Sequence, residues 1–211
     1  MILVLSFHLV MKCTCIAVLF AAISAMPLMG AEGLKLELIA PKETVVLSKA
    51  QLAELASVGG AAEALEEARA EKKPDLESLR RLEGIVMGAL RTQQGIDLSY
   101  RITNPTDAAI ALEHGGDATT NALEIKGDGA VDLPYRGMMT MEFRMGKPIT
   151  IDPGASKEFT IKELKYGMRD MSRWLITKPG DYEITLIHRT NSGGKKVELT
   201  SDPLKLSVVA K

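Results

Sequence analysis

Hydrophobic and polar residues alternate along much of the chain, most regularly in the segment 96–112. Apolar side chains occupy every second position up to Ile102, so an extended strand here would bury one face and expose the other. The run Asn104-Pro105-Thr106-Asp107 then favours a turn, and the alternation resumes after it. We therefore predict an antiparallel hairpin whose buried face contains Tyr100 and Ile102.

The same alternation predicts further short strands, separated by turns rich in Pro, Gly, Asp and Asn. They cover residues 34–40, 44–47, 121–126, 130–133, 139–144, 148–151, 157–161, 182–189, 195–200 and 204–209. Many short strands with few long helices are typical of two packed antiparallel sheets. We expect a mainly β fold, an immunoglobulin-like antiparallel β-sandwich.

A different composition, rich in Ala, Leu, Glu and Lys, occupies residues 48–94 and predicts an α-helical insertion after the first strands. Ser48 and Gln51 form a capping box at the first helix start, and Gly59-Gly60 is expected to end that helix. A charged second helix follows over 61–72. A third helix, starting at Pro74-Asp75, carries apolar side chains at helical spacing up to residue 90 and needs a packing partner.

The chain begins with a segment typical of a secretory leader. Lys12 precedes the apolar run 13–25, and small residues follow up to Ala31, after which we expect cleavage. Met11 is an alternative start to Met1, and an N-terminal membrane anchor is the alternative to cleavage. The expected organisation is a signal peptide at 1–31, first strands at 32–47, the helical insertion at 48–94 and the sandwich at 95–211.

Both cysteines, Cys13 and Cys15, lie inside this leader. A processed chain would therefore contain no disulfide, thiol nucleophile or cysteine metal site, as suits a bacterial periplasmic or secreted protein. The net charge is −1, and removal of Lys12 makes it −2. So small a charge gives no electrostatic reason to expect nucleic acid or an anionic membrane as a partner.

The order of turns and strands resembles that of known immunoglobulin-like proteins. The motifs are the ITNPTD turn, a Gly-Gly-Asp loop, Pro-Gly-Ala-Ser before one strand and Pro-Gly-Asp-Tyr before another. Over residues 96–209 this layout is similar to uncharacterised secreted bacterial proteins of planctomycete type, and to the Bacillus intracellular proteinase-inhibitor domain. The resemblance implies the fold, whereas no reactive-loop residue of the inhibitor family can be matched.

The pattern of strands and turns predicts the positions of three ring-bearing side chains. Tyr182 follows a Pro-Gly turn, where immunoglobulin-like domains place a tyrosine that bonds back to the preceding chain. His188 is expected on the surface of the same strand. Trp174 is expected on a loop, where it is the single aromatic available for sugar binding.

Methionines are concentrated in two places, Met138, Met139, Met141 and Met145 in one and Met168 with Met171 in the other. Thioethers are soft ligands for Cu(I), and with His114 they would resemble a periplasmic copper carrier. The alternation of Met139, Met141, Phe143 and Met145 also fits a strand face packed in the core, which we favour. We therefore predict no cofactor.

Other combinations indicate no site. His114 and Asp117 flank a Gly-Gly loop, yet no nucleophile motif such as Gly-x-Ser-x-Gly accompanies this only candidate base of a hydrolase. Glu124, Asp128 and Asp132 do not match a calcium loop. Gly84 and Gly88 lie in a run too short and too charged for a membrane dimer face.

We expect an exported, non-catalytic, immunoglobulin-like binding or structural module of the cell envelope, with an unknown protein or envelope component as partner. One alternative is a proteinase-inhibitor-like domain that presents loop 165–177 or loop 131–138 to a protease. Further alternatives are the copper carrier and, last, an unknown hydrolase. We place the non-catalytic module first because the sequence contains no catalytic motif.

Overall fold

A computed structural model describes residues 33–71, 75–89, 96–135, 143–161, 164–166 and 171–211. Its strands are β1 (Lys35–Ile39), β2 (Thr44–Leu47), β3 (Leu98–Thr103), β4 (Ile110–His114), β5 (Thr120–Lys126), β6 (Ala130–Tyr135), β7 (Lys147–Ile151), β8 (Ser156–Ile161), β9 (Lys165–Tyr166), β10 (Met171–Ile176), β11 (Gly180–Ser192), β12 (Lys195–Thr200) and β13 (Leu204–Ala210). Its helices are α1 (Lys49–Ala70) and α2 (Leu76–Ala89).

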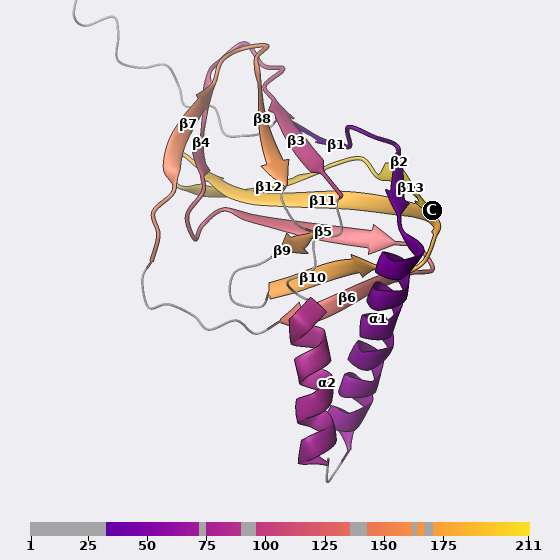
Figure 1. Ribbon diagram of the computed structural model, residues 1–211. Coiled ribbons are helices and arrows are strands. Elements are labelled where there is room, and N and C mark those ends of the chain that lie inside the picture. Colours follow the sequence, from indigo (N-terminus) through magenta and orange to yellow (C-terminus); the bar gives the residue numbers. More distant parts are fainter. Residues whose placement is uncertain (1–32, 72–74, 90–95, 136–142, 162–163, 167–170) are drawn as a thin grey trace, which may run out of the picture.

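The 13-residue strand β11 organises the largest sheet. Along one edge it pairs with β5, and along the other with β13 and then β12, all antiparallel. Strand β2 extends this sheet by parallel pairing with β13. In Figure 1, β11 and β5 run across the middle of the molecule, and the smaller sheets and the two helices lie on either side of them.

Two smaller sheets form the opposing layer, one of order β1-β3-β8 and the other the pair β4-β7. Figure 1 shows both above β11. Their apolar faces meet the apolar face of the β11 sheet, as burial of one face per sheet requires. Fully buried members of this core include Leu98, Ile102, Ile110, Leu112, Leu123, Ile151, Ile184 and Leu186. The fold is thus mainly β, an antiparallel immunoglobulin-like sandwich with a helical insertion after its first strands, as predicted.

The predicted hairpin at 96–112 is wrong, although both of its strands exist. β3 pairs with β1 and β8, and β4 pairs with β7, so the chain crosses from one sheet to another at the turn. Asn104 accounts for the crossing. Its buried amide donates to the carbonyls of Ala108 and Ile151 at 2.7 and 2.9 Å. Its oxygen accepts from Thr106.

Only two helices occupy the described part of the insertion, where the sequence predicted three. α1 continues through Gly59-Gly60 because Gly59 packs against Thr177, which follows β10, and a Cβ at position 59 would lie only 3.3 Å from Thr177 Cγ2. The capping box of Ser48 and Gln51 is confirmed. Gly59 therefore marks a close packing contact, and the glycine pair does not end the helix.

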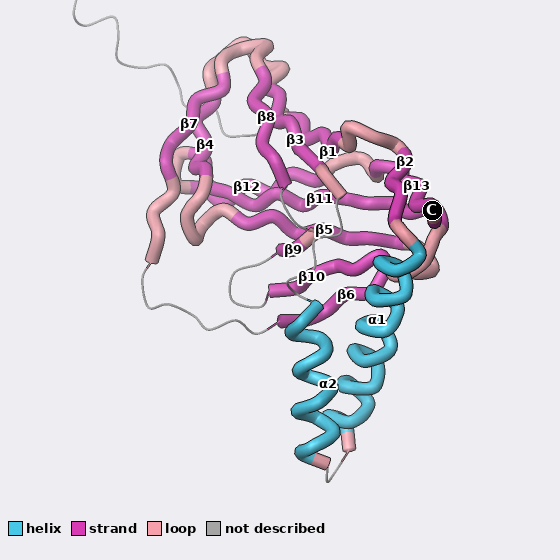
Figure 2. The backbone as a smooth tube through the Cα atoms, in the orientation of Figure 1, coloured by secondary structure: helices cyan, strands magenta, loops and turns pink. Residues whose placement is uncertain are grey.

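The two helices form a hairpin that extends away from the sandwich, as Figure 2 shows. Leu79, Leu82 and the buried Val86 belong to the apolar side of α2, which packs mainly on α1. The helix thus has a packing partner, which is α1 and not an edge of the sandwich. At the base of the hairpin α1 contacts β10, which pairs with β6 and β9. Neither described helix is long and apolar enough to cross a membrane.

The remaining strand predictions differ from the structure in two regions. Residues 139–142 of the predicted strand 139–144 lie outside the described residues, and Phe143 and Met145 are exposed, not packed in the core. β9 and β10 were not predicted. Leu175 and Ile176 at the end of β10 and Thr177 after it are all buried. Their residue types therefore do not alternate between apolar and polar, and the sequence gives no strand signal here.

Candidate functional site

The C-terminal half of β11 separates two polar environments. His188, Thr190 and Ser192 point into the sandwich and are buried, whereas Arg189 and Asn191 point outward. Strict alternation along a strand produces this division. A buried cluster and a surface pocket consequently lie on the two faces of one strand.

The buried cluster is built around His188, which is only 1% exposed. Its Nδ1 lies 2.7 Å from Oδ1 of Asn121 on β5, so the ring N–H donates to the amide oxygen. Asn121 also bonds the hydroxyl of Tyr100 on β3. The expectation of a surface position for His188 is therefore wrong. Residue 188 is six positions after Tyr182, an even number, and so it shares that residue's buried face.

Aromatic contacts extend the cluster to β4 and β8. The Tyr100 ring lies 5.2 Å from His188 and 5.0 Å from Phe159, measured between centroids. His114 also stacks on Phe159, at 4.2 Å between centroids. Two imidazoles thus lie at the ends of a continuous series of rings.

Burial decides the charge of these groups. Burial first, and the nearby imidazole of His114 to a smaller degree, lower the pKa of His188 to about 4. Burial also lowers the pKa of His114 and raises that of Tyr100, against the lowering effect of the bond from Asn121. Both imidazoles are therefore neutral at pH 7.

Polar side chains attach β4 to β11 in place of a backbone ladder. Thr190 Oγ1 donates to the carbonyl of Glu113 at 2.5 Å, and Ser192 Oγ donates to that of Ala111 at 2.8 Å. Asn191 Nδ2 donates to the Glu113 carboxylate at 2.9 Å. β4 uses one edge to pair with β7, so donors from β11 satisfy carbonyls on its other edge. We call these contacts the β4–β11 seam.

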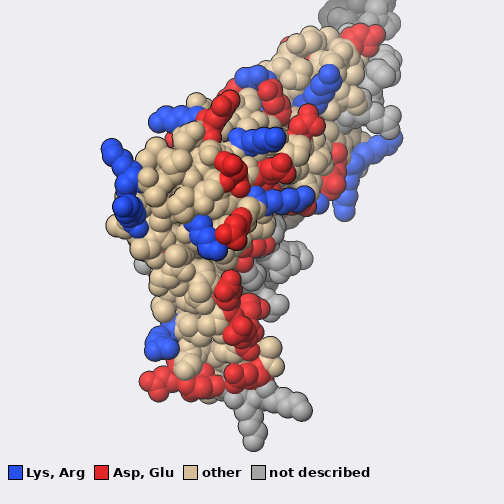
Figure 3. Space-filling model, turned by 90° about the vertical axis from the view of Figure 1, so that its right-hand side faces the viewer, with Lys and Arg blue, Asp and Glu red and all other residues tan. Residues whose placement is uncertain are grey.

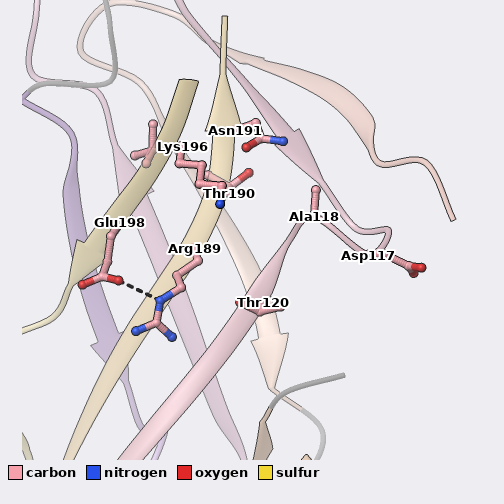
Figure 4. Close-up of a pocket in the computed structure, with 9 residues that line it drawn as sticks. Asp117, Ala118, Thr120, Arg189, Thr190, Asn191, Lys196 and Glu198 are labelled. Carbon is pink, nitrogen blue, oxygen red and sulfur yellow. Dashed lines mark hydrogen bonds and ion pairs between the residues drawn. The ribbon is translucent and has the colours of Figure 1, made fainter. Parts of the chain in front are cut away.

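The surface pocket lies on the outward side of the seam and has a volume of about 540 Å³. It is lined by Asp117, Ala118, Thr120, Arg189, Thr190, Asn191, Lys196, Val197 and Glu198, contributed by β5, β11, β12 and the turn before β5 (Figure 4). Arg189 Nε and Glu198 form an ion pair at 2.7 Å on its wall. Its volume lies in the range of small-ligand sites, and its polar lining suits a polar ligand or a polar protein segment.

Charge elsewhere on the surface is unevenly distributed on the face drawn in Figure 3. Basic and acidic side chains are mixed over the sandwich, whereas acidic side chains gather along the helical hairpin. Because neighbouring positive and negative side chains cancel at a distance, this face has no strong long-range electrostatic field. Recognition on this face of the sandwich would therefore depend on particular side chains.

Of the residues predicted as possible copper ligands, the structure describes the side chains of only Met145 and His114. Met138, Met139 and Met141 lie outside the described residues, and Met145 is 78% exposed. The backbone of Met145 contacts the loop after His114, where a Cβ on Gly116 would meet the Gly146 nitrogen at 2.4 Å. Within the described residues, no three His, Cys, Asp or Glu side chains gather as a metal site.

Two predictions for aromatic residues have opposite outcomes. Tyr182 is buried and its hydroxyl donates to the carbonyl of Lys178 at 2.7 Å, which confirms the structural corner tyrosine. Trp174 lies on β10, not on a loop, and its indole N–H donates to the carbonyl of Leu123 at 2.6 Å. The indole joins two sheets and is no exposed sugar platform.

The two loops expected to contact a protease are also largely strands. β6 covers residues 130–135 and pairs antiparallel with β10, which covers 171–176. Where β6 and β10 pair, their backbone groups bond each other, so these residues form a ladder and not a loop. Residues 136–138, 162–163 and 167–170 of this region lie outside the described part of the chain.

Comparison with known proteins gives no family. No protein-family model and no curated protein matches the chain. Among solved structures, the chain is similar to the cupredoxin domain of amoB from Nitrosocaldus yellowstonii, at 12% identity and a TM-score of 0.29, with 85% of this chain and 88% of that chain covered. A TM-score this low does not establish a common fold, so no property of that domain is transferred.

Proposed function

We propose that this protein is an exported, non-catalytic binding module of a bacterial cell envelope, and that it contacts a partner protein or another envelope component through the pocket on β5, β11 and β12. One observation carries the proposal: the pocket offers charges of both signs together on a wall built from three paired strands. Sites built on strands hold their side chains more firmly than sites on loops.

Support for a non-catalytic role comes from the bonds of the chemically capable side chains. The Tyr182 hydroxyl, the Trp174 indole and the His188 imidazole each have a structural partner inside the protein. His114 stacks on Phe159 at 4.2 Å between ring centroids. A general base must instead reach a proton on a substrate.

Site-directed photocrosslinking tests this proposal. A photoreactive residue replaces Lys196 at the pocket, and in a control it replaces Lys205, which is also exposed on the same sheet but on β13. With the source bacterium's envelope fraction, we expect a discrete adduct from position 196 that unlabelled wild-type protein competes away. The same adducts from both positions, or none from position 196, would contradict the proposal.

Export has its own readout in the same cells. Protein recovered from the envelope should begin at Glu32, as intact mass will show, if the leader is cut after Ala31. Full-length protein in the cytoplasm would contradict the localisation and leave the pocket result to be judged separately.

A copper carrier is the second candidate, because the backbone of Met145 lies against the loop that follows His114. Its test is Cu(I) titration of the processed protein, with Met139→Leu, Met141→Leu and Met145→Leu as variants. Stoichiometric binding that these substitutions abolish would favour copper over the binding module. A flat titration would end the copper proposal.

A further inference from the structure

We infer that the β4–β11 seam is an acid-sensitive clamp, in which the neutral imidazoles of His188 and His114 allow the β4-β7 pair to close on β11 and their protonation releases it. This inference concerns a conformational device and does not depend on the identity of any ligand. It rests on the ring series, on the bonds across the seam and on the way each strand is attached.

The first step concerns the surroundings of His188. The groups that face its ring are Asn121 from β5, Tyr100 from β3 and His114 from β4, beyond Phe159 from β8. Leu199 is its neighbour on β12. Among the described residues none of these provides a carboxylate, so a proton on His188 would produce a buried cation without a counter-ion.

Charged groups around His114 do not remove this penalty. Lys147 lies opposite His114 in the β4-β7 register and carries a positive charge. Glu113 precedes His114, but its carboxylate accepts from Asn191. A second proton, on His114, would add repulsion to the buried cation on His188.

The second step identifies which strand would move. β5, β12 and β13 are joined to β11 by backbone ladders, whereas β4 contacts it through three side-chain bonds and the packed rings. The β1-β3-β8 sheet also faces β11 without a ladder, but it has three strands, whereas β4 and β7 form a two-stranded pair that is only marginally stable without its contacts to β11. The β4-β7 pair is therefore the part that separates.

Release would alter the pocket as well. Thr190 and Asn191 line the pocket, and both are bonded to Glu113 in the closed form. When β4 separates, the amide of Asn191 at the pocket loses its carboxylate partner and can bond another group there. Acid would thus change the polar wall that we propose as a contact surface.

Hydrogen exchange on the full processed chain tests the clamp. Once the β4-β7 pair leaves β11 it is only marginally stable, so its ladder amides lose protection. Their protection factors, corrected for intrinsic exchange, are compared with those of the β1-β3 amides at pH 7.5 and 5.0. The pKa of His188 is about 4 in the closed form and has its ordinary value in the open form. Protonation at pH 5.0 therefore favours the open form, and we expect β4-β7 protection to fall about 30-fold from pH 7.5 to 5.0. The β1-β3 amides should change far less.

Two variants make the result specific. His188→Gln removes the titrating group and should abolish most of the fall. Asn121→Asp places a carboxylate beside an intact His188, so it should preserve protection at pH 5.0, and it serves if His188→Gln does not fold. Equal changes in both pairs of strands, or an undiminished fall in the variant that folds, would overturn the clamp.

Discussion

Nδ1 of His188 lies 2.7 Å from Oδ1 of Asn121, and this bond joins β11 to β5 inside the sandwich. The bond orients an imidazole that burial keeps uncharged. It lies directly behind the strand whose outer face forms the pocket wall. The interior and the candidate binding surface therefore share one element of structure.

Global stability should depend on pH through this histidine. Its pKa is about 4 in the folded state and near 6.5 when unfolded, so the unfolded state binds the proton more strongly. The stabilisation is present above pH 6.5 and is lost as the pH falls toward 4. We expect His188 to account for about 2.5 kcal/mol of the difference in unfolding free energy between pH 7.5 and 4.5.

Urea unfolding of wild type and His188→Gln at both pH values measures this contribution. The wild type should lose more stability than the variant on acidification, since carboxylates affect both proteins alike. Parallel losses in the two proteins would show that His188 has an ordinary pKa in the folded state.

Asn104 should be among the most sensitive positions outside the apolar core. Asn104→Ala removes the side-chain donor to the buried carbonyl of Ile151 and leaves that of Ala108 with Thr106 Oγ1, so we expect a loss of about 3 kcal/mol in unfolding free energy. Asp107→Ala, an exposed change in the same turn, is the control and should stay within about 0.5 kcal/mol. Similar losses at both positions would contradict the assigned role of the buried amide.

The glycine pair in α1 offers a matched comparison of helix propensity with packing. A Cβ added at Gly60 would meet open space, so Gly60→Ala should stabilise the protein by about 0.5 to 1 kcal/mol. Gly59→Ala gains the same propensity but brings its methyl group to 3.3 Å from Thr177 Cγ2. The thermal unfolding midpoint should rise for the first variant only, and a rise for both would mean that the helix does not pack closely here.

The sequence predicted most strands and the class of the fold, because period-two alternation is a local property. It predicted the wrong partners for β3 and β4. A turn followed by renewed alternation fits a hairpin and a crossing equally well, and the deciding bonds join Asn104 to Ile151 and Ala155, distant in the sequence. Pairing between sheets depends on such long-range contacts.

The candidate site was less accessible to sequence reasoning. The buried face of His188 follows from its even separation from Tyr182, so that signal was present and was misassigned. The pocket combines β5, β11 and β12 with no shared motif, and its residue types are common on any surface. Gly59 illustrates the same limit, since its packing partner Thr177 is over a hundred positions away.

Binding of the processed protein to isolated envelope fractions tests the proposed function most directly. Lys196→Glu reverses a charge at the pocket, and Lys205→Glu makes the same change on β13, away from it. We predict that cosedimentation with the envelope fraction falls at least about tenfold for Lys196→Glu, since a like-charge contact replaces a favourable one. Lys205→Glu should behave as wild type. Equal retention of all three proteins would contradict a contact surface at this pocket.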